Sequence, residues 1–380
     1  MDLLKEKVFK KLNKNKTKAE IRILPRDEVE YFYMDKHDKM NYTRSRLSQM
    51  ECDFLDVAGI NEFVYDFSDR MNESEFITFG CITSATGGTL EKNDIHFQTA
   101  RDMNTLYKLD LSILPEYSVF NGQMAAIRCK MTEPDTFSVS KLMILPIFEK
   151  FEESKGDLDL VVAKGPFSEE FIEKLVDLNT QIVVLLGPLS REFRPFQEFT
   201  EMLTEKLRKN MHTRMLLVPS AEDMEFVPTF PQYSMETGSD RVLCLTNPAE
   251  VVVNGHLLAL NNFDALFDLS TNECCHIPSN PTHGMFKGDR LKRLCFHLIF
   301  QHSYAPVMPS QFPICYCSAL QMPVCPDLYI TSSHYGAFDR PVGPCNVINT
   351  GKESSSYYTV FYGSNTYEIR QNRIQFDAEK

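Results

Sequence analysis

The sequence predicts a two-domain α+β chain, with a small barrel or sandwich followed by an α/β domain. The chain has 380 residues, which is more than one hydrophobic core usually serves. Residues 63–147 carry short β-type runs broken by turn signals, whereas after residue 158 buried apolar runs alternate with helical stretches. The two halves therefore belong to different fold classes.

The first half contains one helix and several short strands. Residues 41–62 have helical spacing, with Met50 and Phe54 available for one apolar face. Four β-type runs follow, at residues 76–82, 96–98, 107–111 and 124–129. One glycine pair, at residues 87–88, follows the first run and an Asn-Gly step at 121–122 precedes the last, which is typical of turns between strands. Short strands at this spacing predict a small barrel or sandwich.

The second half begins after a charged, polar stretch at residues 149–157. Its apolar runs lie at residues 158–163, 181–186 and 214–218, and the helical stretches at 169–178 and 193–210 come between them. Buried strands that alternate with helices predict a largely parallel sheet with helices on both faces. We expect the β-rich tail at residues 357–374 to complete this sheet.

The composition excludes several classes of function. The net charge of −12 argues against a chain whose whole surface binds nucleic acid, because phosphate binding needs a basic surface. No run approaches 18 uncharged apolar residues, so a transmembrane helix is not predicted. The eleven cysteines are expected to be thiols, because no apolar signal-peptide core indicates secretion into an oxidising compartment. The cysteine and histidine clusters at 274–283 and 315–325 lack the paired spacing of structural zinc sites.

The charge is uneven along the chain. Residues 1–26 carry nine Lys or Arg against three Asp or Glu, a net of +6, which leaves −18 for the remainder. This basic stretch could be a nuclear-import signal or a nucleic-acid arm, or simply a solvated helix or frayed terminus.

A ligand site in an open α/β sheet would lie at the carboxyl ends of the strands. The corners to inspect are residues 163–167, 187–191, 219–223 and 332–335. The chain resembles the binuclear metallophosphoesterases in this order of strands. At these corners that family carries D-x-H, G-D-x-x-D, G-N-H-D/E and G-H-x-H, because two divalent metals need carboxylate and imidazole ligands.

The four corners lack nearly all of those ligands. Pro188 and Arg191 stand where two carboxylates would, only Asp223 is in register, and His334 is one residue out of step. The degenerate metal-site positions are Ala163, Gly165, Pro188, Arg191, Ala221, Glu222, Ser333 and Tyr335. We therefore expect no catalytic residue, no metal and no cofactor. An active metal-dependent phosphodiesterase is the alternative of another class.

A more specific resemblance rests on the order and spacing of several further stretches. They lie at residues 109–112 with 116–123, 164–167, 186–188, 218–220 with 230–232, 301–306, 320–327 and 345–351. Over roughly residues 45–380 the chain is similar to the B subunits of eukaryotic DNA polymerases alpha, delta and epsilon. These stretches look like the alpha member, whereas residues 360–365 look more like the epsilon member.

The resemblance implies an oligonucleotide-binding-fold (OB-fold) barrel beside an inactive calcineurin-like metallophosphoesterase domain. The expected domains are a basic N-terminal lead-in at 1–44, the OB-fold domain with a preceding helix at 45–150, and the phosphoesterase-like domain at 155–380. It also implies a nuclear, non-catalytic scaffold in DNA replication, without membrane contact. The implied partners are the C-terminal region of the polymerase catalytic subunit and, through the complex, the primase subunits, with DNA contacted at most indirectly.

Aromatic residues near the strand ends that lack the metal ligands are candidates for partner binding. Phe230, Tyr233, Tyr335 and Phe338 follow strands that end there, and large interfaces are aromatic at their centre. The alternative is that these rings only pack the loops of their own domain.

Aromatic and histidine side chains elsewhere have the same two interpretations. Phe97, Tyr107 and Phe120 could stack on single-stranded nucleic acid, but aromatics in strands usually belong to the core. His256 and His302 could be catalytic bases, but a lone histidine is more often structural.

Overall fold

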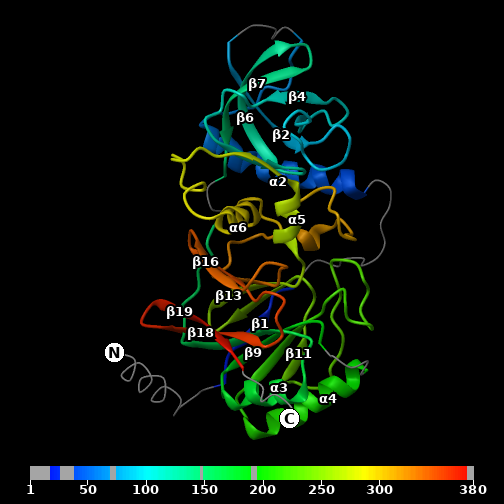
Figure 1. The fold of residues 1–380 in the computed structure, drawn as a ribbon, viewed down its shortest axis with the longest axis vertical. Helices are drawn as coiled ribbons and strands as arrows, with labels where there is room; N and C mark the ends of the chain where they lie inside the picture. Colours follow the sequence, from blue (N-terminus) through cyan, green and yellow to red (C-terminus); the bar gives the residue numbers. More distant parts are fainter. Residues whose placement is uncertain (1–17, 26–37, 69–73, 146–148, 190–194, 375–380) are drawn as a thin grey trace. The chain divides into compact units, whose positions relative to one another are not determined.

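The computed structural model describes residues 18–25, 38–68, 74–145, 149–189 and 195–374 (Figure 1). The chain forms two compact units. The barrel unit contains the described residues of 32–150 and 265–325, and the sheet unit contains those of 1–31, 151–264 and 326–380. Within the described ranges, no helix is long and apolar enough to cross a membrane. Most of the expected basic lead-in lies outside the described residues.

The barrel unit contains a closed five-stranded barrel in the order β2-β3-β4-β7-β6. Its strands are β2 (Phe76–Thr83), β3 (His96–Thr99), β4 (Tyr107–Asp110), β6 (Met124–Glu133) and β7 (Thr136–Met143). β4 and β7 run parallel, and the other neighbours run antiparallel. Phe97, Ile127 and Phe137 fill the interior. Gly80 is required where β2 passes β3, because a Cβ there would lie 2.0 Å from the Gln98 carbonyl oxygen.

Helix α2 (Asp38–Ala58) packs against strands β2 and β6 of the barrel. Its buried positions include Leu47, Met50 and Phe54, which recur at helical spacing. The Phe54 ring lies 4.9 Å from that of Phe79 on β2. The predicted helix at 41–62 is therefore confirmed, with its start three residues earlier and its end at Ala58.

A second stretch of sequence completes the barrel unit. It contains α5 (Ala265–Asn272), β14 (Glu273–His276), α6 (Arg290–Phe300) and the short helix η2 (Ser318–Leu320). β14 pairs antiparallel with β5 (Tyr117–Phe120), which lies in the barrel stretch. The expected domain at 155–380 thus differs from the compact units, in which 265–325 groups with the barrel. Sequence periodicity could not predict the pairing of β14 with β5, because the two strands are about 150 residues apart in the chain.

The sheet unit contains two six-stranded sheets. The first has the order β11-β10-β9-β8-β18-β19, and the second has the order β1-β12-β13-β15-β17-β16. The first sheet comprises β8 (Leu158–Lys164), β9 (Ile182–Leu186), β10 (Arg214–Val218), β11 (Val242–Cys244), β18 (Ser356–Gly363) and β19 (Thr366–Arg373). The second comprises β1 (Ile21–Ile23), β12 (Ala249–Val253), β13 (His256–Asn261), β15 (Leu328–Thr331), β16 (Phe338–Val342) and β17 (Cys345–Asn349).

The first sheet is covered by the second sheet on one face and by helices on the other. Leu158, Leu160 and Val162 of β8 belong to a core shared by strands of both sheets. The alternate residues Val161 and Ala163 belong to a second core. That core includes α3 (Glu169–Asp177), α4 (Phe196–Lys206) and the 3-10 helix η1 (Leu207–Lys209).

The structure corrects the prediction of helices on both faces. Strands β8 to β11 are parallel as expected, but a second sheet replaces one helical layer. A continuous apolar run indicates that both faces of a strand are buried, but it does not indicate whether helices or a second sheet cover them. The sequence therefore could not distinguish helices on both faces from helices on one face and a sheet on the other. The prediction that the tail completes the first sheet is confirmed, because β18 pairs antiparallel with β8.

Candidate functional site at the strand-end corner

The candidate site lies in the sheet unit at the carboxyl ends of β8, β9, β10 and β13. We call it the strand-end corner and define it by Lys164, Gly187, Asp223, Asn262 and Asp264. Parallel pairing brings the ends of β8, β9 and β10 to one edge. This edge is where the sequence analysis expects a ligand site to lie.

Lys164 is the last residue of β8 and is buried, with 8% of its surface exposed. Its ammonium donates to the Gly187 carbonyl oxygen and, over 2.9 Å, to Oδ1 of Asn262. Burial lowers the pKa of Lys164 to about 8, although the nearby Glu222, Asp223 and Asp264 favour the charged form. The corner therefore holds a buried amine surrounded by carboxylates.

Asn262 and Asp223 tie the neighbouring strand ends together. Nδ2 of Asn262 donates to the carbonyl oxygens of Gly187 at 2.9 Å and Pro219 at 3.0 Å. Asp223 accepts from the backbone N–H groups of Leu189 at 2.6 Å and Ser220 at 2.9 Å. Burial is the main cause that raises the pKa of Asp223. The one carboxylate in metal-ligand register thus serves as a cap for backbone N–H groups.

Gly187 is needed for this packing. A Cβ at that position would lie 2.3 Å from Oδ2 of Asp223 and 3.0 Å from the Ser220 nitrogen. Any larger residue would push Asp223 off the loop that it caps. Gly165 is equally constrained, because its Cβ would lie 1.9 Å from the Pro188 carbonyl oxygen.

The second sheet contributes its own hydrogen bonds at its strand ends. Asp264 accepts from Ser333 Oγ at 2.5 Å and from the His334 backbone N–H at 2.7 Å. Asn349 accepts from the Ser333 backbone N–H at 2.8 Å and donates to the Tyr335 carbonyl oxygen at 3.2 Å. Ser333 is therefore held by two side chains through hydrogen bonds.

The structure places seven of the eight degenerate positions. Ala163 is buried in the helix-facing core, Gly165 and Pro188 abut each other, and Ser333 is hydrogen-bonded to Asp264. The other described positions are Ala221 and Glu222, which are exposed, and Tyr335, which is half-buried. Arg191 lies outside the described residues. Among the residues described, no group of three or more His, Cys, Asp or Glu is placed to hold a metal ion.

Sequence reasoning did not select Lys164, Asn262 or Asp264 as site residues. One signal was present, because a lysine that ends an otherwise apolar buried strand needs polar partners. The other two residues follow β13, a strand that the sequence analysis did not identify.

The four aromatic candidates divide into two pairs. Phe230 is 3% exposed and stacks on Phe263 with ring centroids 4.6 Å apart, and Phe338 is 7% exposed. Tyr233 and Tyr335 are half-buried. The burial of the two phenylalanines favours the alternative that they pack their own loops.

Of the remaining aromatic and histidine candidates, Phe97, Phe120 and His256 are buried, whereas Tyr107 and His302 are half-buried. Phe97 and Phe120 are fully buried, and Tyr107 stacks on Phe137 at 4.5 Å. Burial lowers the pKa of His256, and it lowers that of His302 to about 3, which makes His302 a weak base near neutral pH.

The fold and this corner define a class of protein: a chain that joins a closed five-stranded barrel to a pair of packed mixed sheets, with a buried lysine at the sheet edge. The chain belongs to the family of DNA polymerase alpha/epsilon B subunits, whose model matches residues 135–340, more than half of its length.

Relatives with curated names agree with this membership. The chain is 25% identical to the B subunit of DNA polymerase alpha from Rattus norvegicus, over 73% of this chain and 52% of that protein. It is 26% identical to the mouse (Mus musculus) protein of the same name, over 64% and 46%. It is 22% identical to the Saccharomyces cerevisiae one, over 74% and 48%. The chain thus spans about half the length of these relatives.

Solved structures with similar folds include a predicted phosphoesterase from Streptococcus pneumoniae. It is 12% identical, with a TM-score of 0.29 over 58% of this chain and 91% of that chain. Vacuolar Protein Sorting 29 from Cryptosporidium parvum is 9% identical, with a TM-score of 0.29 over 58% and 99%.

Proposed function

We propose that this chain is a non-catalytic accessory subunit of DNA polymerase alpha–primase. In this role it binds the C-terminal region of the polymerase catalytic subunit, is linked to the primase subunits through the complex, and supports the initiation of DNA replication in the nucleus. The observation that carries the proposal is membership of the B-subunit family together with relatives that carry the alpha name.

The buried Lys164 supports a non-catalytic role. Two divalent metals would need carboxylates and imidazoles at the strand-end corner. The side chains there are instead an amine, an amide and a carboxylate that caps backbone N–H groups. A protonated lysine also repels a metal cation, so the corner is proposed to be a degenerate phosphoesterase site that binds no cofactor.

The topology of the barrel supports an OB-fold. Its closed order and its single parallel pair, β4 with β7, match a five-stranded Greek-key barrel of that type. Of the barrel's three candidate stacking aromatics, Phe97 and Phe120 are core residues and the half-buried Tyr107 stacks on Phe137. The chain beyond residue 26 carries a net charge of −18. Both features favour protein partners over direct contact with DNA.

The partner-facing residues are proposed to include the two half-buried tyrosines, Tyr233 and Tyr335. Phe230 and Phe338 would then pack inside the domain and stabilise the loops that carry the two tyrosines. This division follows from exposure alone, since a buried ring offers little surface to a partner.

Titration against catalytic subunits tests the proposal. The full chain is titrated with purified C-terminal regions of the polymerase alpha, delta and epsilon catalytic subunits under identical salt. We expect saturable binding to the alpha region at the lowest concentration. Preferential binding to the epsilon or delta region would reassign the chain, and binding to none would contradict a scaffold of this type.

A further inference from the structure

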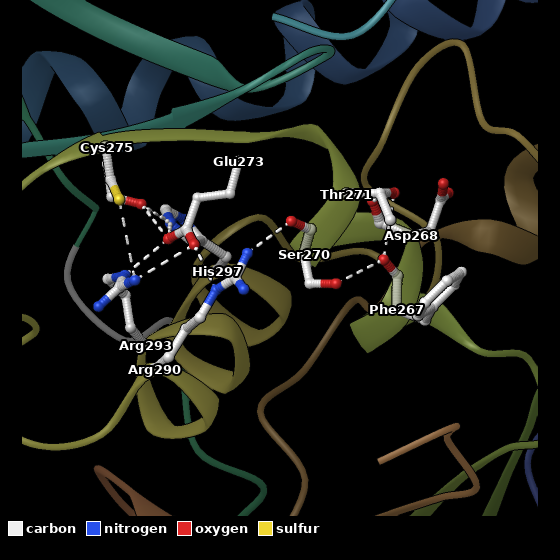
Figure 2. A network of polar contacts seen from close by, with 10 residues as sticks. Phe267, Asp268, Ser270, Thr271, Glu273, Cys275, Arg290, Arg293 and His297 are labelled. Atoms are coloured by element: carbon white, nitrogen blue, oxygen red, sulfur yellow. Dashed lines mark hydrogen bonds and ion pairs between the residues drawn. The ribbon is translucent and has the colours of Figure 1, made fainter.

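A buried polar network in the barrel unit has Glu273 at its centre (Figure 2). Glu273 begins β14, and its side chain is 1% exposed. It accepts from Arg293 Nε at 2.6 Å and Arg293 Nη2 at 3.2 Å, and from Arg290 Nε at 3.2 Å. It also accepts from Ser118 Oγ at 2.6 Å, and Ser118 lies on β5. One carboxylate therefore bonds to side chains from β5 and α6.

Ser118 and His297 extend the network to the buried side of α6. His297 Nε2 lies 2.7 Å from Ser118 Oγ and 4.0 Å from Glu273. Because the single hydroxyl proton of Ser118 goes to Glu273, His297 donates to the hydroxyl oxygen. The arrangement resembles a Ser-His-Glu triad in composition only, since the serine and the glutamate both face Nε2 and all three side chains are buried.

Arg290 connects the network to α5. Its Nη2 donates over 2.6 Å to the Ser270 carbonyl oxygen in the last turn of that helix. A cation at a helix C-terminus is favoured by the helix dipole. The view in Figure 2 shows the arginine between the two groups, with Glu273 on one side and Ser270 on the other.

Further hydrogen bonds join residues 265–325 to the barrel residues within 32–150. The side chain of Gln301, at the end of α6, exchanges two hydrogen bonds with the Met124 backbone, at 2.8 and 3.1 Å. Glu116 accepts from the backbone N–H groups of Thr282 at 2.9 Å and His283 at 2.6 Å. Cys274 of β14 belongs to the barrel core itself.

We propose that Glu273 is a buried anionic clasp that holds residues 265–325 on the barrel, so that β14 and α6 open together when it is lost. Removing the carboxylate leaves Arg293 buried without its counter-ion, which is far costlier than removing an exposed pair. Local opening of such a cooperative segment precedes global unfolding, and it exposes side chains that the native state protects.

Thiol labelling of a Glu273→Gln variant of the full chain tests the clasp. Cys274 on β14 and Cys295 on α6 are buried, whereas Cys345 is buried in the sheet unit and Cys52 is exposed. We expect labelling of Cys274 and Cys295 to accelerate about a hundredfold or more. Cys345 and Cys52 should keep their wild-type rates, and Glu91→Gln, at an exposed carboxylate of the same unit, should change nothing.

Two results would overturn the proposal. Cys274 and Cys295 could remain as protected as in the wild type, or Cys345 could accelerate to the same extent, which would indicate global destabilisation. If Glu273→Gln does not fold, Ser118→Ala removes a single hydrogen bond to the carboxylate and should give a smaller acceleration of the same two cysteines. An unchanged rate at both cysteines in that variant would be equally decisive against the clasp.

Discussion

Lys164 shows how a single residue changes what a strand-end corner can do. A buried ammonium that donates to a carbonyl and an amide fills the corner with a cation that is part of the chain. The residue identities at the four corners allow the loss of metal ligands to be predicted from the sequence alone. The lysine's hydrogen-bond partners could not be predicted, because they follow β9 and β13, strands far apart in sequence.

The protonation of Lys164 gives a prediction for alkaline pH. Its folded-state pKa of about 8 lies below the unfolded value of 10.5, so between these values the unfolded chain binds more protons. The free energy of unfolding of the wild type, relative to Lys164→Met, should therefore rise from pH 8 to pH 10. Urea titrations across this range measure it, with Lys287→Met at an exposed site as control. Equal slopes for the wild type and Lys164→Met would contradict the buried-amine account.

Phe230 gives a prediction that separates packing from partner binding. Because its ring is buried and stacked on Phe263, Phe230→Ala should lower the free energy of unfolding by about 3 kcal/mol. Tyr233→Ala, at a half-buried ring, should cost less stability and more affinity for the catalytic subunit. Denaturant unfolding and binding titration of both variants provide the measurement. A Phe230→Ala protein of unchanged stability but weakened binding would reverse the assignment.

Secondary-structure elements were predicted where local patterns decide them. The apolar runs that became β8, β9 and β10 and the amphipathic stretches that became α3 and α4 were identified correctly. β5 and β7 were missed in the barrel half, where β5 is only four residues long and pairs with β14 in a separate two-stranded sheet. β1 was missed because it lies in a stretch that was interpreted from its charge, although it pairs antiparallel with β12.

The segment around β1 gives a prediction at this scale. Ala19 is 4% exposed and belongs to the core between the two sheets, whereas Lys18 beside it is exposed. Ala19→Asp would bury a carboxylate without a partner and should lower the free energy of unfolding by at least about 2 kcal/mol. Lys18→Asp should leave stability nearly unchanged. Thermal unfolding of both variants checks this, and equal melting temperatures would mean that this segment is not part of the core.

At the scale of the whole molecule, two histidines with lowered pKa values predict acid sensitivity. Burial lowers the pKa of His297 to about 4 and that of His302 to about 3, against an ordinary value of 6.5. Below pH 6.5 the unfolded chain binds protons that the folded chain does not, so stability falls as the pH drops toward 4. For His297 the loss should be about 3 kcal/mol.

The measurement is the free energy of unfolding between pH 7 and 4. Relative to the wild type, His297→Gln should flatten this dependence, while His334→Gln, at an exposed site, should not. A His297→Gln protein with the same acid dependence as the wild type would show that His297 titrates normally in the folded state.

The division into units marks the limit of what sequence patterns decide for the whole molecule. The sequence pattern changes near residue 150 from short β-type runs to apolar runs that alternate with helical stretches, which separates a barrel from an α/β half. The boundary between the two compact units lies between Lys150 and Phe151. The return of residues 265–325 to the barrel depends on buried pairs such as Glu273 with Ser118, which no local pattern encodes.

Affinity purification of the chain from its native cell, with identification of the co-purifying proteins, tests whether the chain is a subunit of DNA polymerase alpha–primase. We expect to recover the catalytic subunit of DNA polymerase alpha and both primase subunits, in amounts comparable to the chain itself. Recovery of the catalytic subunit of DNA polymerase delta or epsilon instead, or of no polymerase subunit at all, would contradict this expectation.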